Sequence, residues 1–236
     1  MFISNRKSPL FQQSDRQGRS IVPIWYGAPW LVALLGVVVM PRLLTCQWRA
    51  FFFDVADKAN HLKTMHIINK EKTIAFTGNR NLTSPDGRPL PELKAAICNH
   101  LMNLLEREHL DNGITTFISG MALGFDLLCA TVVVELKRKY PEIRLVAALP
   151  FIEQADKYPP SELSQYRHLI DQADFTIAIG GYTYTNQAYH DRNDFMLANA
   201  SKIVAYHNGK SRSGTGSTLR KAEELGVGVV NLYDRI

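Results

Sequence analysis

The polar residues best suited to bind a charged ligand are concentrated in one segment made of Ser211, Arg212, Ser213, Gly214, Thr215, Gly216, Ser217 and Thr218. This segment follows a β-branched run at 202–206 and leads into a helical pattern at 218–225. Backbone N–H groups at the start of a helix bind anions, and glycines let the backbone close around phosphate oxygens. We therefore predict a phosphate-binding loop, with a flexible Ser/Gly turn as the alternative.

This segment differs from two common phosphate loops. A Walker loop requires GxxxxGK[ST], which is absent, and Leu219 occupies the place of the third glycine of a GxGxxG fingerprint. The hydroxyl groups that add donors here belong to Ser213, Thr215, Ser217 and Thr218. ATPases and ordinary NAD-dependent dehydrogenases are therefore disfavoured.

Asp126 is a carboxylate inside a long apolar run. Residues 115–119 are rich in β-branched and aromatic side chains, as in a buried strand, and Gly120 then permits a tight turn. We predict a helix from Met121 to about Lys139, because this run holds good helix formers and no proline. Asp126, one turn into that helix, could accept hydrogen bonds from a ligand hydroxyl or only tie two loops together. Both interpretations remain open, and ligand contact would involve Gly120 as well.

Another polar segment follows the first predicted strand, 73–77. Thr77 and Gly78 end this strand, and Arg80 comes directly after it. A guanidinium group pairs with phosphate or carboxylate through two parallel hydrogen bonds. We therefore expect Thr77, Gly78 and Arg80 to contribute to the ligand site, with a surface ion pair as the alternative for Arg80.

Two further sets of residues follow later strands. Arg192 could neutralise ligand charge and Asn193 could read a ribose or base, with capping of the same helix by Asp191 as the alternative interpretation of this segment. Glu153 is the second acidic candidate for a catalytic role, after Asp126, although solvent exposure is its default. Aromatic side chains near the strand ends could stack on a base or simply pack, namely Phe151, Tyr182, Tyr184 and Tyr189.

Strands and helices alternate along the second part of the chain. Strands are predicted at 73–77, 115–119, 143–149, 174–179, 202–206 and 227–232, and helices at 89–110, 121–139, 163–172, 187–200 and 218–225. This pattern predicts an α/β fold with a doubly wound, mainly parallel sheet and helices on both faces. The carboxyl ends of the strands would meet at one edge, where such folds bind ligands. In the usual strand order the first and fourth strands are neighbours, with the crevice between them.

The charge and the cysteines narrow the classes of function. Residues 1–64 hold eight Lys/Arg against three Asp/Glu, which accounts for the whole net charge of +5 among 236 residues. Residues 65–236 are formally neutral, which argues against binding of nucleic acid through its phosphates. The three cysteines form no CxxC pair and the histidines form no ligand pair. We therefore expect a reducing compartment, no structural metal and no required cofactor.

Residues 1–64 form an N-terminal hydrophobic extension that precedes the predicted domain at 65–236. The stretch 20–41 contains no charged residue, but Pro23, Gly27 and Pro29 interrupt its first half. A membrane anchor is one interpretation of this stretch. The favoured one is an upstream extension of the reading frame before a start at Met65, which makes the protein cytoplasmic. Association with a second copy of the chain is left open.

Five separated segments resemble, in the same order, the YpsA-like family of the SLOG superfamily. They are Thr77-Gly78-Asn79-Arg80, 119–126, 148–151, Arg192-Asn193 and 214–218. The superfamily also includes the DNA-processing protein DprA and the LOG phosphoribohydrolases. The resemblance covers about residues 72–232 and implies a Rossmann-like domain that binds a nucleotide or a nucleotide-derived ligand, such as an ADP-ribose-like molecule.

Two departures from the family patterns concern catalysis. Asn79 stands where the family's Thr-Gly-His-Arg motif has histidine. The LOG hydrolases carry a PGGxGTxxE pattern, and here Ser213 replaces a glycine, Ser217 the threonine and Arg220 the glutamate. A cation cannot stabilise an oxocarbenium-like centre or activate water as a carboxylate does.

The leading hypothesis is therefore a small-molecule nucleotide-binding or sensing module without LOG-type hydrolysis. In it the 214–218 loop holds phosphate, Arg80 adds charge, and Asp126 and Asn193 contact ribose or base. The first alternative is a hydrolase of the N-glycosidic bond of a nucleotide, with Asp126 or Glu153 as the acid. The second is a DprA-like single-stranded DNA binder, which the neutral charge of residues 65–236 disfavours.

Overall fold

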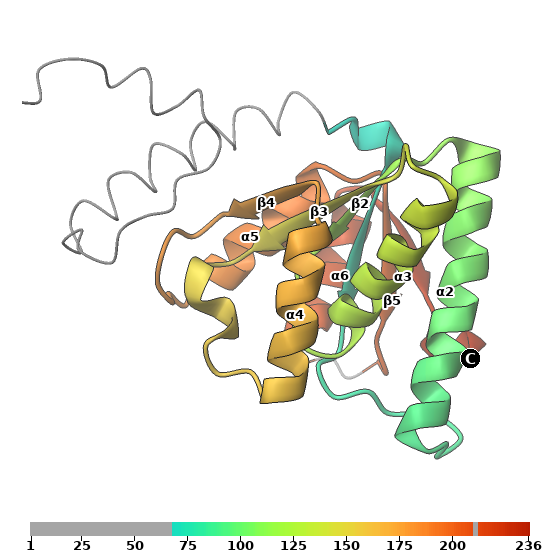
Figure 1. Cartoon of the computed structure of the whole chain (residues 1–236), viewed down its shortest axis with the longest axis horizontal. Coiled ribbons are helices and arrows are strands. Elements are labelled where there is room, and N and C mark those ends of the chain that lie inside the picture. The colour runs from blue at the N-terminus through green and yellow to red at the C-terminus, as the bar shows by residue number, and fades with distance from the viewer. Residues whose placement is uncertain (1–67, 210–211) are drawn as a thin grey trace, which may run out of the picture. The chain divides into compact units, whose positions relative to one another are not determined.

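The computed structural model describes residues 68–209 and 212–236 (Figure 1). The extension at 1–64, its uncharged stretch 20–41 and Ser211 lie outside the described residues. Within those two ranges, no helix combines the length and apolar character that crossing a bilayer requires.

Six parallel strands form one sheet, in the order β4-β3-β2-β1-β5-β6. The strands are β1 (Thr73–Gly78), β2 (Thr116–Ser119), β3 (Arg144–Leu149), β4 (Phe175–Ala178), β5 (Lys202–Tyr206) and β6 (Gly228–Asn231). The helices are α2 (Leu90–Asn112), α3 (Phe125–Lys139), α4 (Pro160–Gln172), α5 (Ala188–Ala198) and α6 (Gly214–Glu224). Single 3-10 turns are η1 (Lys70–Lys72), η2 (Ile152–Ala155) and η3 (Tyr233–Arg235). The predicted Rossmann-like α/β fold with a parallel sheet is confirmed.

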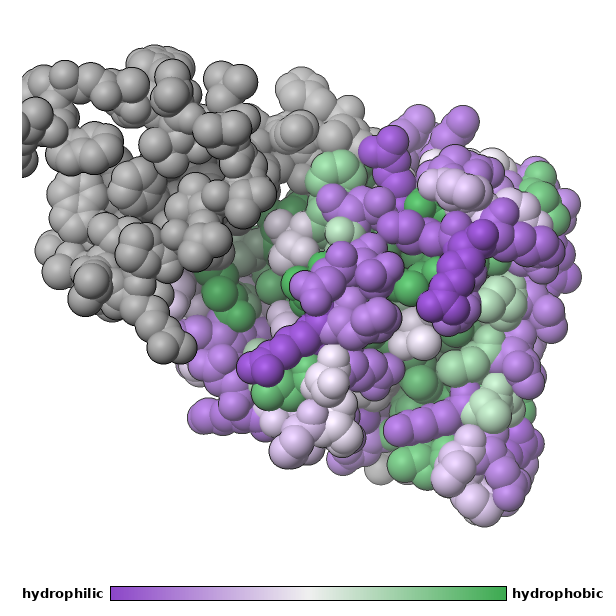
Figure 2. All heavy atoms as spheres, in the orientation of Figure 1, coloured by the Kyte–Doolittle hydropathy of each residue, from purple (hydrophilic) through white to green (hydrophobic). Residues whose placement is uncertain are grey.

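Helices cover both faces of the sheet. Figure 1 shows α2, α3 and α4 in front of the strands and α5 and α6 behind them. The β1 side chains alternate accordingly: Ile74 and Phe76 pack toward α2 and α3, whereas Ala75 packs toward α5 and α6. In the same orientation, Figure 2 shows hydrophilic side chains over much of the front face, with apolar ones between them. Each helix therefore presents its apolar side to the sheet.

The predicted contact between the first and fourth strands is wrong. β1 pairs with β2 on one side and with β5 on the other, while β4 is the strand at the edge beside β3. The chain adds β2, β3 and β4 outward in one direction, with the intervening helices on one face. It then returns to β5 on the far side of β1, so α5 and α6 cover the opposite face. The strand order therefore reverses between β1 and β5, where a doubly wound sheet opens a crevice.

The predicted start of the helix after Gly120 is also wrong. The helix α3 begins at Phe125 and not at Met121, because Met121 and Gly124 have φ values of 53° and 83° in the left-handed region. At Gly124 an added Cβ would lie 2.2 Å from the carbonyl oxygen of Arg80. Residues 120–124 thus form a turn that packs against the loop after β1, and Asp126 lies in the first turn of α3.

Candidate functional site

A cavity of about 670 Å³ lies at the carboxyl ends of β1 and β5. Predicted site residues make up more than half of its lining, namely Thr77, Gly78, Arg80, Asp126, Arg192, Asn193, Ser213, Gly214 and Thr215. They come from the end of β1, the start of α3, the middle of α5 and the first turn of α6. The structure therefore gathers segments far apart in the chain at the point where the strand order reverses.

The first turn of α6 forms one wall of this cavity. Ser213 is its N-cap, with an extended backbone, and its Oγ accepts a 2.9 Å hydrogen bond from the backbone N–H of Gly216. Gly214 and Thr215 follow as the first helical residues, whose N–H groups have no partner within a helix. These groups, together with the positive end of the helix dipole, make this wall attractive to an anion.

Two of the predicted site residues in this loop, Gly216 and Thr218, serve the helix itself. The hydroxyl of Thr218 donates a 3.1 Å hydrogen bond to the carbonyl oxygen of Gly214, and the side chain is buried. At Gly216 an added Cβ would lie 3.1 Å from Ser213 Oγ, so glycine leaves room for the cap. Gly216 and Thr218 therefore stabilise the first turn of α6. Ser217 and Thr218 line a separate hollow of about 380 Å³ between α5 and α6.

His207 supports the cap and was not a predicted site residue. Its Nε2 lies 2.8 Å from Ser213 Oγ, and its Nδ1 accepts a 3.3 Å hydrogen bond from the N–H of Gly209. With Nδ1 as the acceptor, Nε2 carries the proton and donates to Ser213. The only sequence signal for this role is the position of His207 directly after β5, six residues before the cap.

A buried ion pair forms the opposite wall. Arg192 Nη1 lies 3.7 Å from Asp126 Oδ2, and the two side chains are 8% and 6% exposed. An added Cβ at Gly120 would lie 1.5 Å from Arg192 Nη1, so no other residue type leaves the guanidinium in this place. Gly120 therefore contributes by its missing side chain.

Burial shifts the titration of both partners toward their neutral forms. It raises the pKa of Asp126 to about 6, although the Arg192 charge, a hydrogen bond from the Ala122 backbone and the Arg80 charge all act to lower it. Burial likewise lowers the pKa of Arg192, against the opposing effect of Asp126. The desolvation of this pair is thus incompletely offset by its attraction, as for many buried ion pairs.

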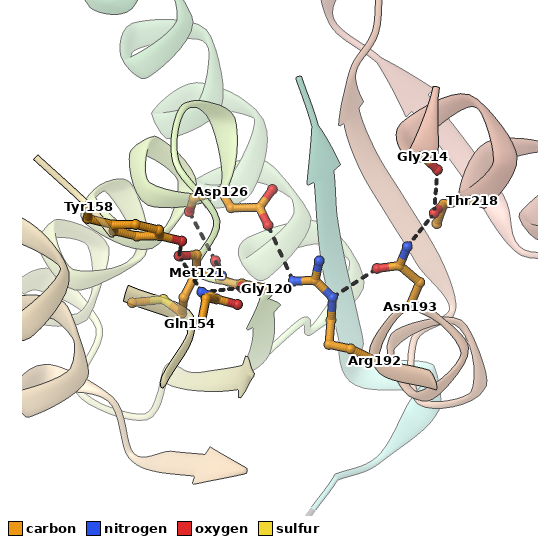
Figure 3. Close-up of polar contacts among 10 residues, drawn as sticks. Gly120, Met121, Asp126, Gln154, Tyr158, Arg192, Asn193, Gly214 and Thr218 are labelled. Atoms are coloured by element: carbon orange, nitrogen blue, oxygen red, sulfur yellow. Dashed lines mark hydrogen bonds and ion pairs between the residues drawn. The ribbon is translucent and has the colours of Figure 1, made fainter. Parts of the chain in front are cut away.

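A chain of side chains links the two walls (Figure 3). Arg192 Nε donates a 2.8 Å hydrogen bond to Asn193 Oδ1, and Asn193 Nδ2 donates a 2.9 Å hydrogen bond to Thr218 Oγ1. The adjacent positions of Arg192 and Asn193 on α5 thus tie the start of α3 to the first turn of α6. Asn193 uses both ends of its amide in this connection, which makes it a positioning residue.

The turn at 120–124 is held by residues that sequence reasoning did not identify. Gln154 Nε2 donates hydrogen bonds of 3.3 Å and 2.9 Å to the carbonyl oxygens of Gly120 and Met121. The Tyr158 hydroxyl donates a 3.2 Å hydrogen bond to the same Met121 oxygen, and burial raises the pKa of Tyr158 to about 12. The second catalytic candidate, Glu153, precedes Gln154 in the η2 turn and does not line the cavity.

Arg80 lies at the mouth of the cavity beside aromatic side chains. Its guanidinium carbon is 5.4 Å from the centre of the Tyr189 ring, and that of Arg192 is 5.9 Å from the same ring. Tyr189 in turn packs edge-on against Phe151, with the ring centres 5.7 Å apart. Of the predicted aromatic residues, Tyr189 lines the cavity, while Phe151 supports it from below the surface.

The fold and the site define a Rossmann-like α/β protein with a polar cavity at the reversal of strand order. A family model described as the YspA SLOG family matches residues 84–226, more than half of the chain. The chain belongs to this family, as the predicted resemblance to YpsA-like proteins implied.

Two relatives carry the designation UPF0398, and one of them is named YpsA. A UPF0398 protein of Staphylococcus epidermidis is 28% identical over 142 residues, which is 58% of this chain and 73% of the relative. The UPF0398 protein YpsA of Bacillus subtilis is 23% identical over 158 residues, covering 65% of this chain and 85% of that protein. Among solved structures, the DNA processing protein A of Helicobacter pylori matches with a TM-score of 0.49 and 16% identity. That match covers 70% of this chain and 67% of the other.

Proposed function

We propose that this protein binds a small nucleotide-derived ligand whose phosphate lies on the first turn of α6. The observation that carries this proposal is the cavity that joins this turn to the buried pair of Asp126 and Arg192. Helix starts of this kind bind phosphate in many Rossmann-like folds. The volume of about 670 Å³ lies within the range of small-molecule sites.

The charge of the cavity supports an anionic ligand. Of the described residues that line it, three are arginines and one is a carboxylate, namely Arg80, Arg192, Arg212 and Asp126. Arg192 is compensated by Asp126, whereas Arg80 and Arg212 are exposed. The excess positive charge is therefore available to a phosphate group from the open side.

Hydrolysis in the manner of the LOG enzymes does not fit this site. Arg220, which replaces the glutamate of their pattern, is exposed on α6 and does not line the cavity. The proposed role is therefore binding or sensing of the ligand, with an ADP-ribose-like molecule as one candidate.

Isothermal titration with AMP, ADP-ribose, NAD and inorganic phosphate tests the proposal, with Gly214→Asp as the variant. An added Cβ at Gly214 meets no atom within 4 Å, so a side chain can start there, and the aspartate adds a negative charge to the first turn of α6. We expect Gly214→Asp to weaken binding at least tenfold, or about 1.4 kcal/mol, and the matched control Gly214→Ala to bind like the original protein. No heat with any of these compounds, or equal binding in both variants, would contradict the proposal.

Hydrolysis of an N-glycosidic bond is a second candidate, and one observation favours it. The pKa of about 6 for Asp126 suits a general acid near neutral pH, and this carboxyl group lines the cavity. Release of free base from nucleoside monophosphates, lost in Asp126→Asn, would establish this activity. Absence of base release in the original protein would contradict this second candidate.

A further inference from the structure

Arg192 holds a hydrogen-bond donor that no described residue satisfies. Its side chain is 8% exposed, and Nη1 is buried without a hydrogen-bond partner among the described residues. The 3.7 Å between Nη1 and Asp126 Oδ2 exceeds the length of a hydrogen bond. An unsatisfied buried donor lowers the free energy of unfolding by about 1–3 kcal/mol, and by more when it is charged, so this arrangement destabilises the ligand-free protein.

Asp126 and Arg192 both line the cavity, and their acceptor and donor atoms lie 3.7 Å apart. Arg192 can only donate hydrogen bonds, and Asp126 in its ionised form can only accept them. A hydroxyl group does both, because its oxygen accepts from the guanidinium while its hydrogen points to the carboxylate. A second ligand anion at this place would meet the Asp126 charge, and an apolar group would leave Nη1 unsatisfied.

The second anchoring point lies across the cavity at a fixed spacing. Asn193 connects Arg192 to Thr218 through hydrogen bonds of 2.8 Å and 2.9 Å, and Thr218 is bonded to Gly214 in the first turn of α6. Figure 3 shows these groups as one chain of contacts that runs from the Asp126 carboxylate to Gly214 in the first turn of α6. The protein thus holds two recognition points at a fixed separation. One would contact a hydroxyl-bearing part of the ligand, and the other its phosphate.

We infer that Asp126 and Arg192 select ligands that contain a ribose 5′-phosphate with a free 2′,3′-diol over their deoxy analogues. This inference rests on the proposed phosphate site. Two neighbouring hydroxyls supply one hydrogen to the carboxylate and one oxygen to the guanidinium. A deoxy sugar leaves one of these buried groups unpaired, and sites built around such hydrogen bonds reject analogues that lack the hydroxyl. Asp126 and Arg192 are thus specificity-determining residues, and Asn193 positions them.

The test compares AMP, 2′-deoxy-AMP, 3′-deoxy-AMP and inorganic phosphate by isothermal titration with the original full-length protein. We expect AMP to bind at least tenfold more tightly than the weaker of the two deoxy analogues. Equal affinities for the three nucleotides would overturn the inference. It would also be overturned if inorganic phosphate binds and AMP does not. In both cases the phosphate site would stand. If none of these four compounds and no titration with ADP-ribose gives binding heat, both the phosphate site and the diol selection are overturned.

Asp126→Asn sharpens this comparison. The amide keeps the size of the side chain and removes the negative charge, so we expect the preference for AMP over its deoxy analogues to fall toward one. Affinity for inorganic phosphate should not fall, because loss of the Asp126 charge leaves Arg192 uncompensated in the same cavity. A retained preference in a folded variant would contradict the role of Asp126. The ligand comparison on the original protein keeps the inference testable even if this variant does not fold.

Discussion

The two walls of the cavity are built on opposite principles. The α6 wall is a capped helix start whose Gly214 is exposed, with open space where a side chain would stand. The α3 wall is a buried ion pair, held under a turn that Gln154 and Tyr158 fix by hydrogen bonds. The first wall suits any phosphate, whereas the second is costly to build, and we propose that it selects by hydrogen-bond geometry. In the proposed function, this division assigns affinity to the α6 wall and specificity to the α3 wall.

Gly120→Ala is expected to have the largest effect and to disrupt the α3 wall alone. The new Cβ would overlap the position of Arg192 Nη1, so the guanidinium must leave the Asp126 carboxylate unpaired. Breaking a buried pair in this way costs about 3 kcal/mol of unfolding free energy. Urea unfolding measures it, with Gly214→Ala on the other wall as the control that should change stability by less than about 0.5 kcal/mol. Equal stability of both variants would show that the walls do not differ as described.

The second prediction concerns the pH dependence of stability that Asp126 gives to the α3 wall. Because the pKa of Asp126 is raised to about 6 from its ordinary value of 3.8, the folded state holds more protons than the unfolded state in this interval. The contribution of Asp126 to stability is therefore fully present below about pH 4 and is lost as pH rises through 6. The loss amounts to about 3 kcal/mol.

Asp126→Asn removes this titration and isolates its contribution. The difference in unfolding free energy between the original protein and the variant should change by about 3 kcal/mol between pH 4 and pH 7, in favour of the variant at the higher pH. Denaturant unfolding at both pH values gives the comparison. Parallel pH profiles for the two proteins would show that Asp126 titrates normally and that the α3 wall is not desolvated.

Ser213→Ala should give the smallest effect, confined to the α6 wall. It removes the acceptor for the Gly216 N–H and the partner of His207, which costs about 1 kcal/mol of unfolding free energy. Affinity for inorganic phosphate should fall a few-fold, because the first turn loses its cap, while the preference for AMP over 2′-deoxy-AMP is kept. Ser217→Ala, at an exposed position in the same turn, is the matched control and should leave both quantities unchanged. A lost sugar preference in Ser213→Ala would contradict the separation of the walls.

Local sequence pattern predicted most of the fold. Buried parallel strands are continuous apolar runs, so 73–77 and 202–206 were found nearly to the residue. The start of α3 was misplaced because an apolar helical pattern continues through Met121, where the backbone turns left-handed. The strand order was wrong because it depends on where the chain reverses direction across the sheet, which no local pattern records.

The site was predictable where it depends on short segments. The loop before α6 and the positions of Arg80, Asp126 and Arg192 followed from their places after strands, and all of these line one cavity. The supporting residues were not predictable, because Gln154 contacts a turn more than 30 residues earlier in the chain. Glu153 was singled out for its charge, yet in the η2 turn it is the neighbouring Gln154 that reaches Gly120 and Met121.

An NMR titration of the ¹⁵N-labelled protein with AMP tests the central claim most directly. Bound phosphate on the first turn of α6 should shift the amide resonances of Gly214 and Thr215, and contact with the other wall should shift the Nε resonance of Arg192. Both sets should move with one dissociation constant, since Asn193 links the two walls. Shifts confined to residues away from the cavity, or none at all up to millimolar AMP, would contradict the account.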